Sequence, residues 1–160
     1  MHWDFITDIV LVAAIAVLGV FAFLGLYQWI IRGSLKKVDR NLLAFAPVLA
    51  VMLAVYLFFD HVLIITTRPD GSGKPSFPSS HVMAVATIFA FVALNLPRYV
   101  KNQKLRITLY ALMAILTLIV AAGRIIAGKH WPIDVLFGLI FAGLFTALYR
   151  FIIKRKEPHG

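Results

Sequence analysis

The side chains most able to do chemistry occur in two polar clusters that interrupt long apolar stretches. The first cluster contains Arg68, Lys74 and the run Phe77-Pro78-Ser79-Ser80-His81, and the second contains Arg124, Lys129, His130 and Asp134. Guanidinium groups and hydroxyls bind phosphate oxygens, while an imidazole can attack phosphorus or carry a proton. The clusters together predict a site for a phosphate group.

His130 and Asp134 lie four residues apart at the predicted start of a helix. Pro132 suits a first helical turn, and this spacing places the two side chains about one turn apart on nearly the same side. A carboxylate there can fix the tautomer of a histidine nucleophile and raise its basicity. The alternative is an acid that only stabilises the positive end of the helix dipole. The pair alone leaves both interpretations open.

The first cluster is predicted to open another helix after Pro78. Free backbone N–H groups at a helix start, together with the hydroxyls of Ser79 and Ser80, can hold a phosphate, and Arg68 with Arg124 can add bidentate hydrogen bonds. His81 would then protonate the leaving oxygen. The alternative is that one serine is only a helix cap and His81 only a polar residue at the membrane interface.

The composition is that of an integral membrane protein. The hydrophobic share is 61%, and no cysteine is present, so disulfides and thiolate metal sites are excluded. The formal net charge is +9, but the basic residues lie in short clusters between apolar runs, as in membrane loops. We therefore do not expect a nucleic-acid partner. The sequence gives no indication of the oligomeric state.

Five apolar segments predict an all-α, polytopic transmembrane bundle that forms a single domain over residues 1–160. The predicted spans are 9–31, 42–65, 80–96, 107–127 and 133–153. A cleaved signal peptide is disfavoured because the residues before the first span carry Asp4 and Asp8 but no Lys or Arg. The stretch 66–79 has three prolines and two glycines, which cannot continue a helix.

The distribution of Lys and Arg predicts the topology. Segments 32–40, 98–106 and 150–156 carry four each, twelve of the sixteen, and are therefore expected in the cytoplasm. This places the C-terminus in the cytoplasm and the N-terminus outside the cell membrane. The other four cations are Arg68, Lys74, Arg124 and Lys129. Two spans separate the polar clusters, so both clusters are expected at the outer face, where an anionic ligand would explain the cations.

These residues resemble the three signature segments of the phosphatidic acid phosphatase type 2 superfamily of lipid phosphatases. The segments are Arg68-Pro69, Pro78-Ser79-Ser80-His81, and Gly123-Arg124 with five residues before His130 and three more before Asp134. The likeness covers roughly residues 60–145. It implies a phosphatase without metal or other cofactor, in which His130 forms a phosphohistidine and His81 is the general acid. It also implies that Asp134 orients His130 while Arg68 and Arg124 hold the phosphoryl group.

The chain departs from that family pattern at three positions and in its span count. His61 stands where the family usually has a lysine; two helical turns before Arg68, it is expected to face the same way and to bind phosphate when protonated. Otherwise Lys74 or Lys129 supplies that charge. Gly123 replaces the usual serine and Ser80 the usual glycine, and five spans are predicted where six are usual.

The expected substrate is a membrane lipid phosphate entering from the bilayer. By analogy with the family, undecaprenyl diphosphate is the first choice, because the outward orientation exposes the site to that diphosphate. Phosphatidate and phosphatidylglycerol phosphate are close alternatives. A different class of function, motivated by the missing lysine, is a protein that binds a phospholipid without hydrolysis or transfers its phosphoryl group.

Overall fold

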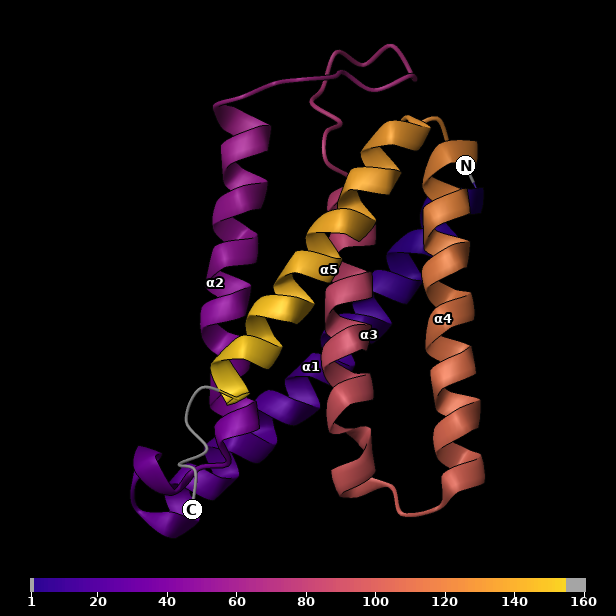
Figure 1. Cartoon of the computed structure of the whole chain (residues 1–160). Helices are drawn as coiled ribbons and strands as arrows, with labels where there is room; N and C mark the ends of the chain where they lie inside the picture. The colour runs from indigo at the N-terminus through magenta and orange to yellow at the C-terminus, as the bar shows by residue number, and fades with distance from the viewer. Residues whose placement is uncertain (1, 155–160) are drawn as a thin grey trace.

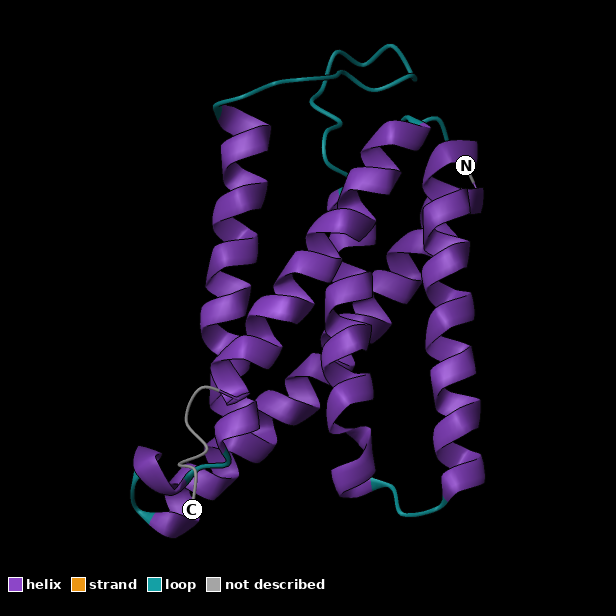
Figure 2. Ribbon diagram, viewed as in Figure 1, coloured by secondary structure: helices purple, strands orange, loops and turns teal. Residues whose placement is uncertain are grey.

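The computed structural model describes residues 2–154 and consists of five long helices (Figures 1 and 2). They are α1 His2–Arg32, α2 Arg40–His61, α3 Ser80–Tyr99, α4 Gln103–Ile126 and α5 Pro132–Lys154, with a short 3₁₀ helix, η1 Leu35–Lys37, after α1. Each long helix is long and apolar enough to cross a membrane. The prediction of an all-α bundle with five spans is confirmed.

Several helix boundaries differ from the predicted spans. α1 begins at His2 rather than near residue 9, and α2 ends at His61 rather than at residue 65. Residues 62–67 leave the helix as a run rich in β-branched side chains, which favour extended backbone. α3 continues past Pro97 to Tyr99, although Pro97 has no N–H to donate to the preceding turn. Arg155 and Lys156, which belong to the predicted cytoplasmic segment 150–156, lie outside the described residues.

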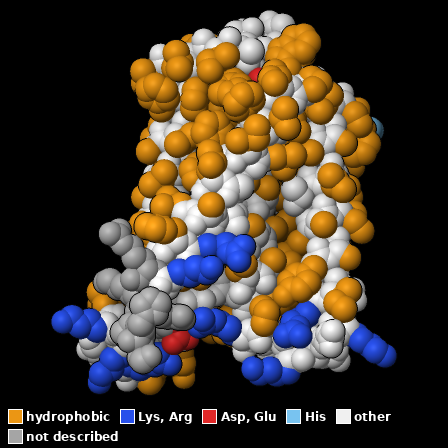
Figure 3. Space-filling view, viewed as in Figure 1, with side chains coloured by type: hydrophobic (Ala, Val, Ile, Leu, Met, Phe, Trp, Pro, Cys, Tyr) orange, Lys and Arg blue, Asp and Glu red, His pale blue; other side chains and the backbone are white. Residues whose placement is uncertain are grey.

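α3 is the central helix of the bundle. Half of its twenty residues are buried, and it packs against α1, α2, α4 and α5. Its Val82, Val85, Ile88 and Phe91 belong to one apolar core. α1 crosses obliquely over α3 and α4 rather than running parallel to them (Figure 1). Large apolar side chains cover much of the outside, as expected for lipid-facing helices (Figure 3).

The connections that carry the two polar clusters lie at one end of the bundle. The segment 62–79 and the turn between α4 and α5 meet there, beside the start of α1 (Figure 1). Thr67 and Pro75 form an isolated antiparallel bridge, and Gly71 with φ of 75° and Gly73 with φ of 68° turn the chain between them. Lys and Arg side chains gather at the opposite end (Figure 3).

Candidate active site

Hydrogen bonds fasten the segment 62–79 to the turn between α4 and α5. The indole Nε1–H of Trp131 donates to the carbonyl of Thr67 at 2.9 Å, and the N–H of Ser79 donates to the carbonyl of Asp134 at 3.0 Å. The two polar clusters are therefore held against each other, as their shared end of the bundle predicted.

His130 lies between these segments with only 4% of its surface exposed. Its Nδ1 lies 2.7 Å from the carbonyl oxygen of Ser76. Because a carbonyl can only accept, Nδ1 carries the proton and Nε2 keeps its lone pair. Nε2 is buried and has no hydrogen-bond partner among the described residues. Burial, together with the positive charge of Arg124, lowers the pKa of His130 to about 4, so the imidazole is neutral at pH 7.

Asp134 supports His130 in a different way from the one predicted. Its Oδ2 lies 3.9 Å from Nδ1 of His130, which is too far for a hydrogen bond. The carboxylate instead accepts from the hydroxyl of Thr66 at 2.8 Å and from the N–H of Trp131 at 2.9 Å. The Thr66 hydroxyl lies 2.9 Å from that of Ser76, whose carbonyl contacts His130. Asp134 is therefore linked to the imidazole indirectly, through its hydrogen bond with Thr66 and the contact of Thr66 with Ser76.

Arg124 is almost completely buried near the end of α4, with 5% of its surface exposed. Its Nη1 donates to Asp4 Oδ1 at 3.2 Å and to Thr7 Oγ1 at 3.4 Å, and lies 3.7 Å from Asp8 Oδ1. Nε is buried and has no partner among the described residues. One side of the guanidinium is thus anchored to α1, while Nε remains available for a ligand.

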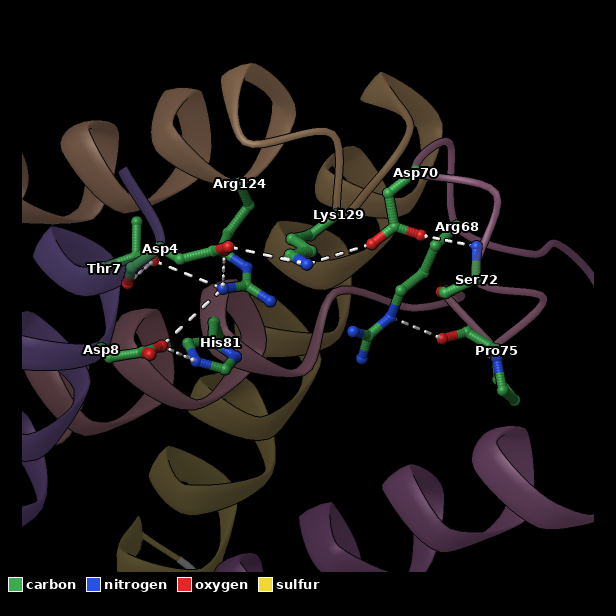
Figure 4. Close-up of polar contacts among 10 residues, drawn as sticks. All are labelled: Asp4, Thr7, Asp8, Arg68, Asp70, Ser72, Pro75, His81, Arg124 and Lys129. Atoms are coloured by element: carbon green, nitrogen blue, oxygen red, sulfur yellow. Dashed lines mark hydrogen bonds and ion pairs between the residues drawn. The ribbon is translucent and has the colours of Figure 1, made fainter. Parts of the chain in front are cut away.

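Arg68 faces Arg124 across a gap (Figure 4). Its Nε donates to the carbonyl of Pro75 at 3.4 Å, and its terminal nitrogens point toward Arg124. His81 and Lys129 lie beside the same gap. The structure therefore brings together two guanidiniums, an imidazole and an ammonium, a set suited to a phosphoryl group.

The start of α3 contributes Ser79, Ser80 and His81. Ser79 is fully buried, and its hydroxyl has no partner among the described residues. Ser80 lines a small polar pocket together with Arg68 and His130. His81 Nε2 lies 2.9 Å from the carboxylate of Asp8.

His61 and Lys74 are not brought into this cluster. The expectation for His61 required a helix that continues to Arg68, but α2 ends at His61. The His61 side chain is 67% exposed and lies 3.6 Å from the Asp60 carboxylate. Lys74 is exposed at the turn of the loop. Lys129 is the additional cation at the gap.

Lys129 is held by acids from two different segments. Its Nζ lies 3.0 Å from Asp70 and 3.6 Å from Asp4. Hydrogen bonds from Ser72 and the nearby Lys129 keep the pKa of the Asp70 carboxyl well below its usual range. The expectation that an anionic ligand alone explains the outer cations is therefore incomplete, because carboxylates of this chain already pair with Lys129 and Arg124.

Sequence reasoning missed the acids of α1 and the loop residues behind His130. Asp4 and Asp8 have the four-residue spacing that places side chains on one helix face, but they entered only the argument about a signal peptide. Thr66 and Ser76 carry no signature, and Ser76 acts through its backbone. Among residues 2–154, no three histidine or carboxylate side chains are grouped to hold a metal ion. Metal independence stays a prediction that a chelator can test.

Comparisons with known proteins agree with this geometry. A family model described as the PAP2 superfamily matches residues 59–157. A lipid A 1-phosphatase from Rhizobium etli is 36% identical over 99 residues, which cover 61% of this chain and 38% of that protein. The match thus spans well under half of that relative.

A solved structure resembles nearly the whole chain. It is the crystal structure of a transmembrane PAP2-type phosphatidylglycerolphosphate phosphatase from Bacillus subtilis, which matches with a TM-score of 0.66 over 99% of this chain and 78% of the other. At 21% sequence identity this likeness concerns the fold alone. Since the family model covers more than half of the sequence, the chain belongs to the PAP2 superfamily.

Proposed function

We propose that this chain is a membrane lipid phosphatase that works through a phosphohistidine at His130. The observation that carries the proposal is the set of buried polar atoms without partners among the described residues. These atoms are Ser79 Oγ, Arg124 Nε and His130 Nε2. Buried polar groups in folded proteins are nearly always paired, so three such atoms in one site favour a polar ligand. Ser79 Oγ and Arg124 Nε can each donate a hydrogen bond to an oxygen of an anion, and His130 Nε2 can act as a nucleophile.

In the proposed first step, the phosphoryl group lies in the gap between Arg68 and Arg124. The lone pair of His130 Nε2 attacks phosphorus, the bond from phosphorus to the lipid oxygen breaks, and His81 gives its proton to that oxygen. The guanidiniums stabilise the charge on the equatorial oxygens without moving during the reaction.

In the proposed second step, water attacks the phosphohistidine. His81, now neutral, takes a proton from that water, the bond between phosphorus and nitrogen breaks, and inorganic phosphate leaves. His130 is regenerated with its proton still on Nδ1, where the Ser76 carbonyl holds it.

We propose undecaprenyl diphosphate as the first lipid to test. Lys and Arg gather at one end of the bundle, which the positive-inside rule predicts to be cytoplasmic (Figure 3). The site lies at the opposite end, which is therefore expected at the outer face. Phosphatidate and phosphatidylglycerol phosphate remain alternatives, the second also because of the solved structure with this fold. The Rhizobium etli relative is a lipid A 1-phosphatase, so lipid A that carries its 1-phosphate is the fourth lipid to test.

The test is release of inorganic phosphate from these four lipids by detergent-purified protein in EDTA, with His130→Ala as the control. Release that disappears in the variant supports the phosphatase and ranks the substrates. Activity that EDTA abolishes and Mg²⁺ restores would contradict the metal-independent mechanism. Saturable lipid binding without turnover would favour a binding protein, and a labelled phosphate appearing on a second lipid would favour a transferase.

A further inference from the structure

We infer that the first two turns of α1 are part of the active site, with Asp4 positioning Arg124 and Asp8 positioning His81. This inference rests on the proposed function and extends it to a helix that lies outside the matched residues 59–157. Figure 4 shows the Asp8 carboxylate on the side of His81 that faces away from Arg68, and the Asp4 carboxylate against the guanidinium of Arg124.

Asp4 fixes the direction in which Arg124 presents its donors. Asp4 and Thr7 engage the Nη1 nitrogen, and the hydroxyl of Thr7 is itself held by the carbonyl of Asp4 at 2.9 Å. Nε and Nη2 form the parallel pair of donors that binds two oxygens of an oxyanion. Nε has no partner among the described residues, and the free end of the guanidinium points toward Arg68 in Figure 4. Asp4 thus holds one nitrogen and leaves the bidentate edge for the phosphoryl group.

Asp8 acts on His81 in a corresponding way. Its ionised carboxylate can only accept, so the 2.9 Å contact places a proton on Nε2 of His81. The other ring nitrogen, Nδ1, faces the Arg68 side of the gap in Figure 4 and is the one able to serve the leaving oxygen. Asp8 Oδ1 also lies 3.7 Å from Nη1 of Arg124. When the His81 imidazole carries its second proton, the negative charge of Asp8 therefore reduces the repulsion between that imidazolium and the Arg124 guanidinium.

The packing of α1 against α4 supplies an independent argument. A Cβ atom at Gly123 would lie 2.7 Å from Thr7 Cγ2 and 3.2 Å from a ring carbon of Trp3. Thr7 is fully buried in this contact. The serine usual in the family at this position has no room here. Glycine therefore permits the close approach that brings Asp4 and Asp8 to the site, which explains this departure from the family pattern.

The test compares substrates whose leaving groups differ in their need for a proton. Asp8→Asn should slow turnover of phosphatidate about 10- to 100-fold, since a lipid alkoxide needs general-acid help. The same variant should slow the initial burst of nitrophenolate from p-nitrophenyl phosphate, which reports formation of the phosphohistidine, less than about threefold, because nitrophenolate leaves without a proton. Asp8→Glu should recover part of the loss. The matched control is Asp39→Asn, which removes a carboxylate that pairs with Arg32 at the opposite end of the bundle and should leave both rates unchanged.

Asp4→Asn should act on binding instead. We expect kcat/KM to fall about tenfold for both substrates and the inhibition constant of orthovanadate to rise by a similar factor, because a loosened Arg124 binds phosphoryl oxygens less well. Gly123→Ser, which pushes α1 away, should combine both defects.

Three results would overturn the inference. One is an equal loss on both substrates in the first step, formation of the phosphohistidine, in Asp8→Asn. Another is tighter vanadate inhibition of Asp8→Asn, which would mean that Asp8 merely occupies the place of the phosphate. The third is a wild-type kcat/KM together with a wild-type inhibition constant of orthovanadate in Asp4→Asn. If the wild-type protein released no phosphate from any lipid, the proposed function itself would fail. Thermal stabilisation by orthophosphate, compared between wild type and Asp4→Asn, would still decide the part of the inference that concerns Arg124.

Discussion

Among residues 2–154 there are two buried polar clusters, one near each end of the bundle, and they differ in how completely their hydrogen bonds are formed. In the inner cluster, Asn95 Nδ2 donates to the hydroxyl of Tyr149 at 2.9 Å and to the carbonyl of Phe91 at 2.8 Å. The Tyr149 hydroxyl in turn donates to the carbonyl of Asn41 at 3.3 Å. The outer cluster contains all the buried side-chain atoms without partners among the described residues.

This difference separates polar groups that satisfy one another from polar groups that we propose bind a ligand. The inner cluster ties α2, α3 and α5 together through hydrogen bonds from Asn95 to Tyr149 and from Tyr149 to Asn41. In the outer cluster, Ser79, Arg124 and His130 each leave a donor or acceptor unused, which costs about 1–3 kcal/mol per group. Proteins tolerate such local costs mainly at functional sites.

The strongest way to test this contrast is His130→Asn. The asparagine amide can still donate to the Ser76 carbonyl, so the fold should persist, but no nucleophilic nitrogen remains. Phosphate release should fall at least about 10³-fold, while the thermal unfolding midpoint in detergent changes by only a few degrees. A variant that keeps more than a tenth of the activity would contradict a phosphohistidine at this residue.

The pH dependence of kcat/KM should also distinguish the buried His130 from a histidine with an ordinary pKa. Burial and then Arg124 disfavour the protonated imidazole, which lowers the pKa of His130 to about 4. The neutral form, which attacks, therefore persists above that pH and is lost below it. We expect kcat/KM to fall about tenfold per unit below pH 4 rather than below about 6.5.

The measurement is phosphate release from a soluble ester between pH 3.5 and 7.5, after the ionisation of the ester itself has been divided out. Samples returned to pH 7 should regain full activity, which excludes irreversible acid unfolding as the cause. An acid limb near pH 6.5 that belongs to the enzyme would contradict the burial of a neutral His130.

Much of the outer cluster could be predicted from the sequence because it depends on hydropathy and short spacings. Counting the spans between His81 and Arg124 placed both polar clusters at one end. The residue types at Ser79, Arg124 and His130 indicated a phosphate site, and these are the residues whose atoms lack partners.

The rest depends on contacts between residues far apart in the chain, which no local pattern encodes. The pairing of Arg124 with Asp4 joins positions 120 residues apart and follows from the oblique path of α1. The contact of His130 with Ser76 uses a backbone carbonyl, which every residue has. The exact end of α2 also escaped prediction, since a run such as Val62-Leu63-Ile64-Ile65 is apolar enough to extend the span.

The inner cluster should behave in the opposite way to the outer one. Tyr149→Phe keeps the ring against Phe45 and Phe91 but removes the hydroxyl that links Asn95 to Asn41. We expect a loss of about 1 kcal/mol in the free energy of unfolding, with kcat/KM unchanged within about twofold. Thermal unfolding and phosphate release on the same preparation measure both. A tenfold loss of activity without loss of stability would mean that the two clusters are coupled.

His61→Lys should have the smallest effect, although it restores the residue usual in the family. The side chain lies at the end of α2 and is 67% exposed, and its ion pair is with Asp60. A charge there is largely screened by water and salt, so kcat/KM should change less than about twofold. Lys129→Gln is the matched comparison, because Lys129 lies at the gap (Figure 4) and its loss should raise KM several-fold. A tenfold increase in turnover in His61→Lys, with no effect of Lys129→Gln, would contradict this prediction. A cation at position 61 would then matter for catalysis, and the end of α2 would have to approach the phosphate during the reaction.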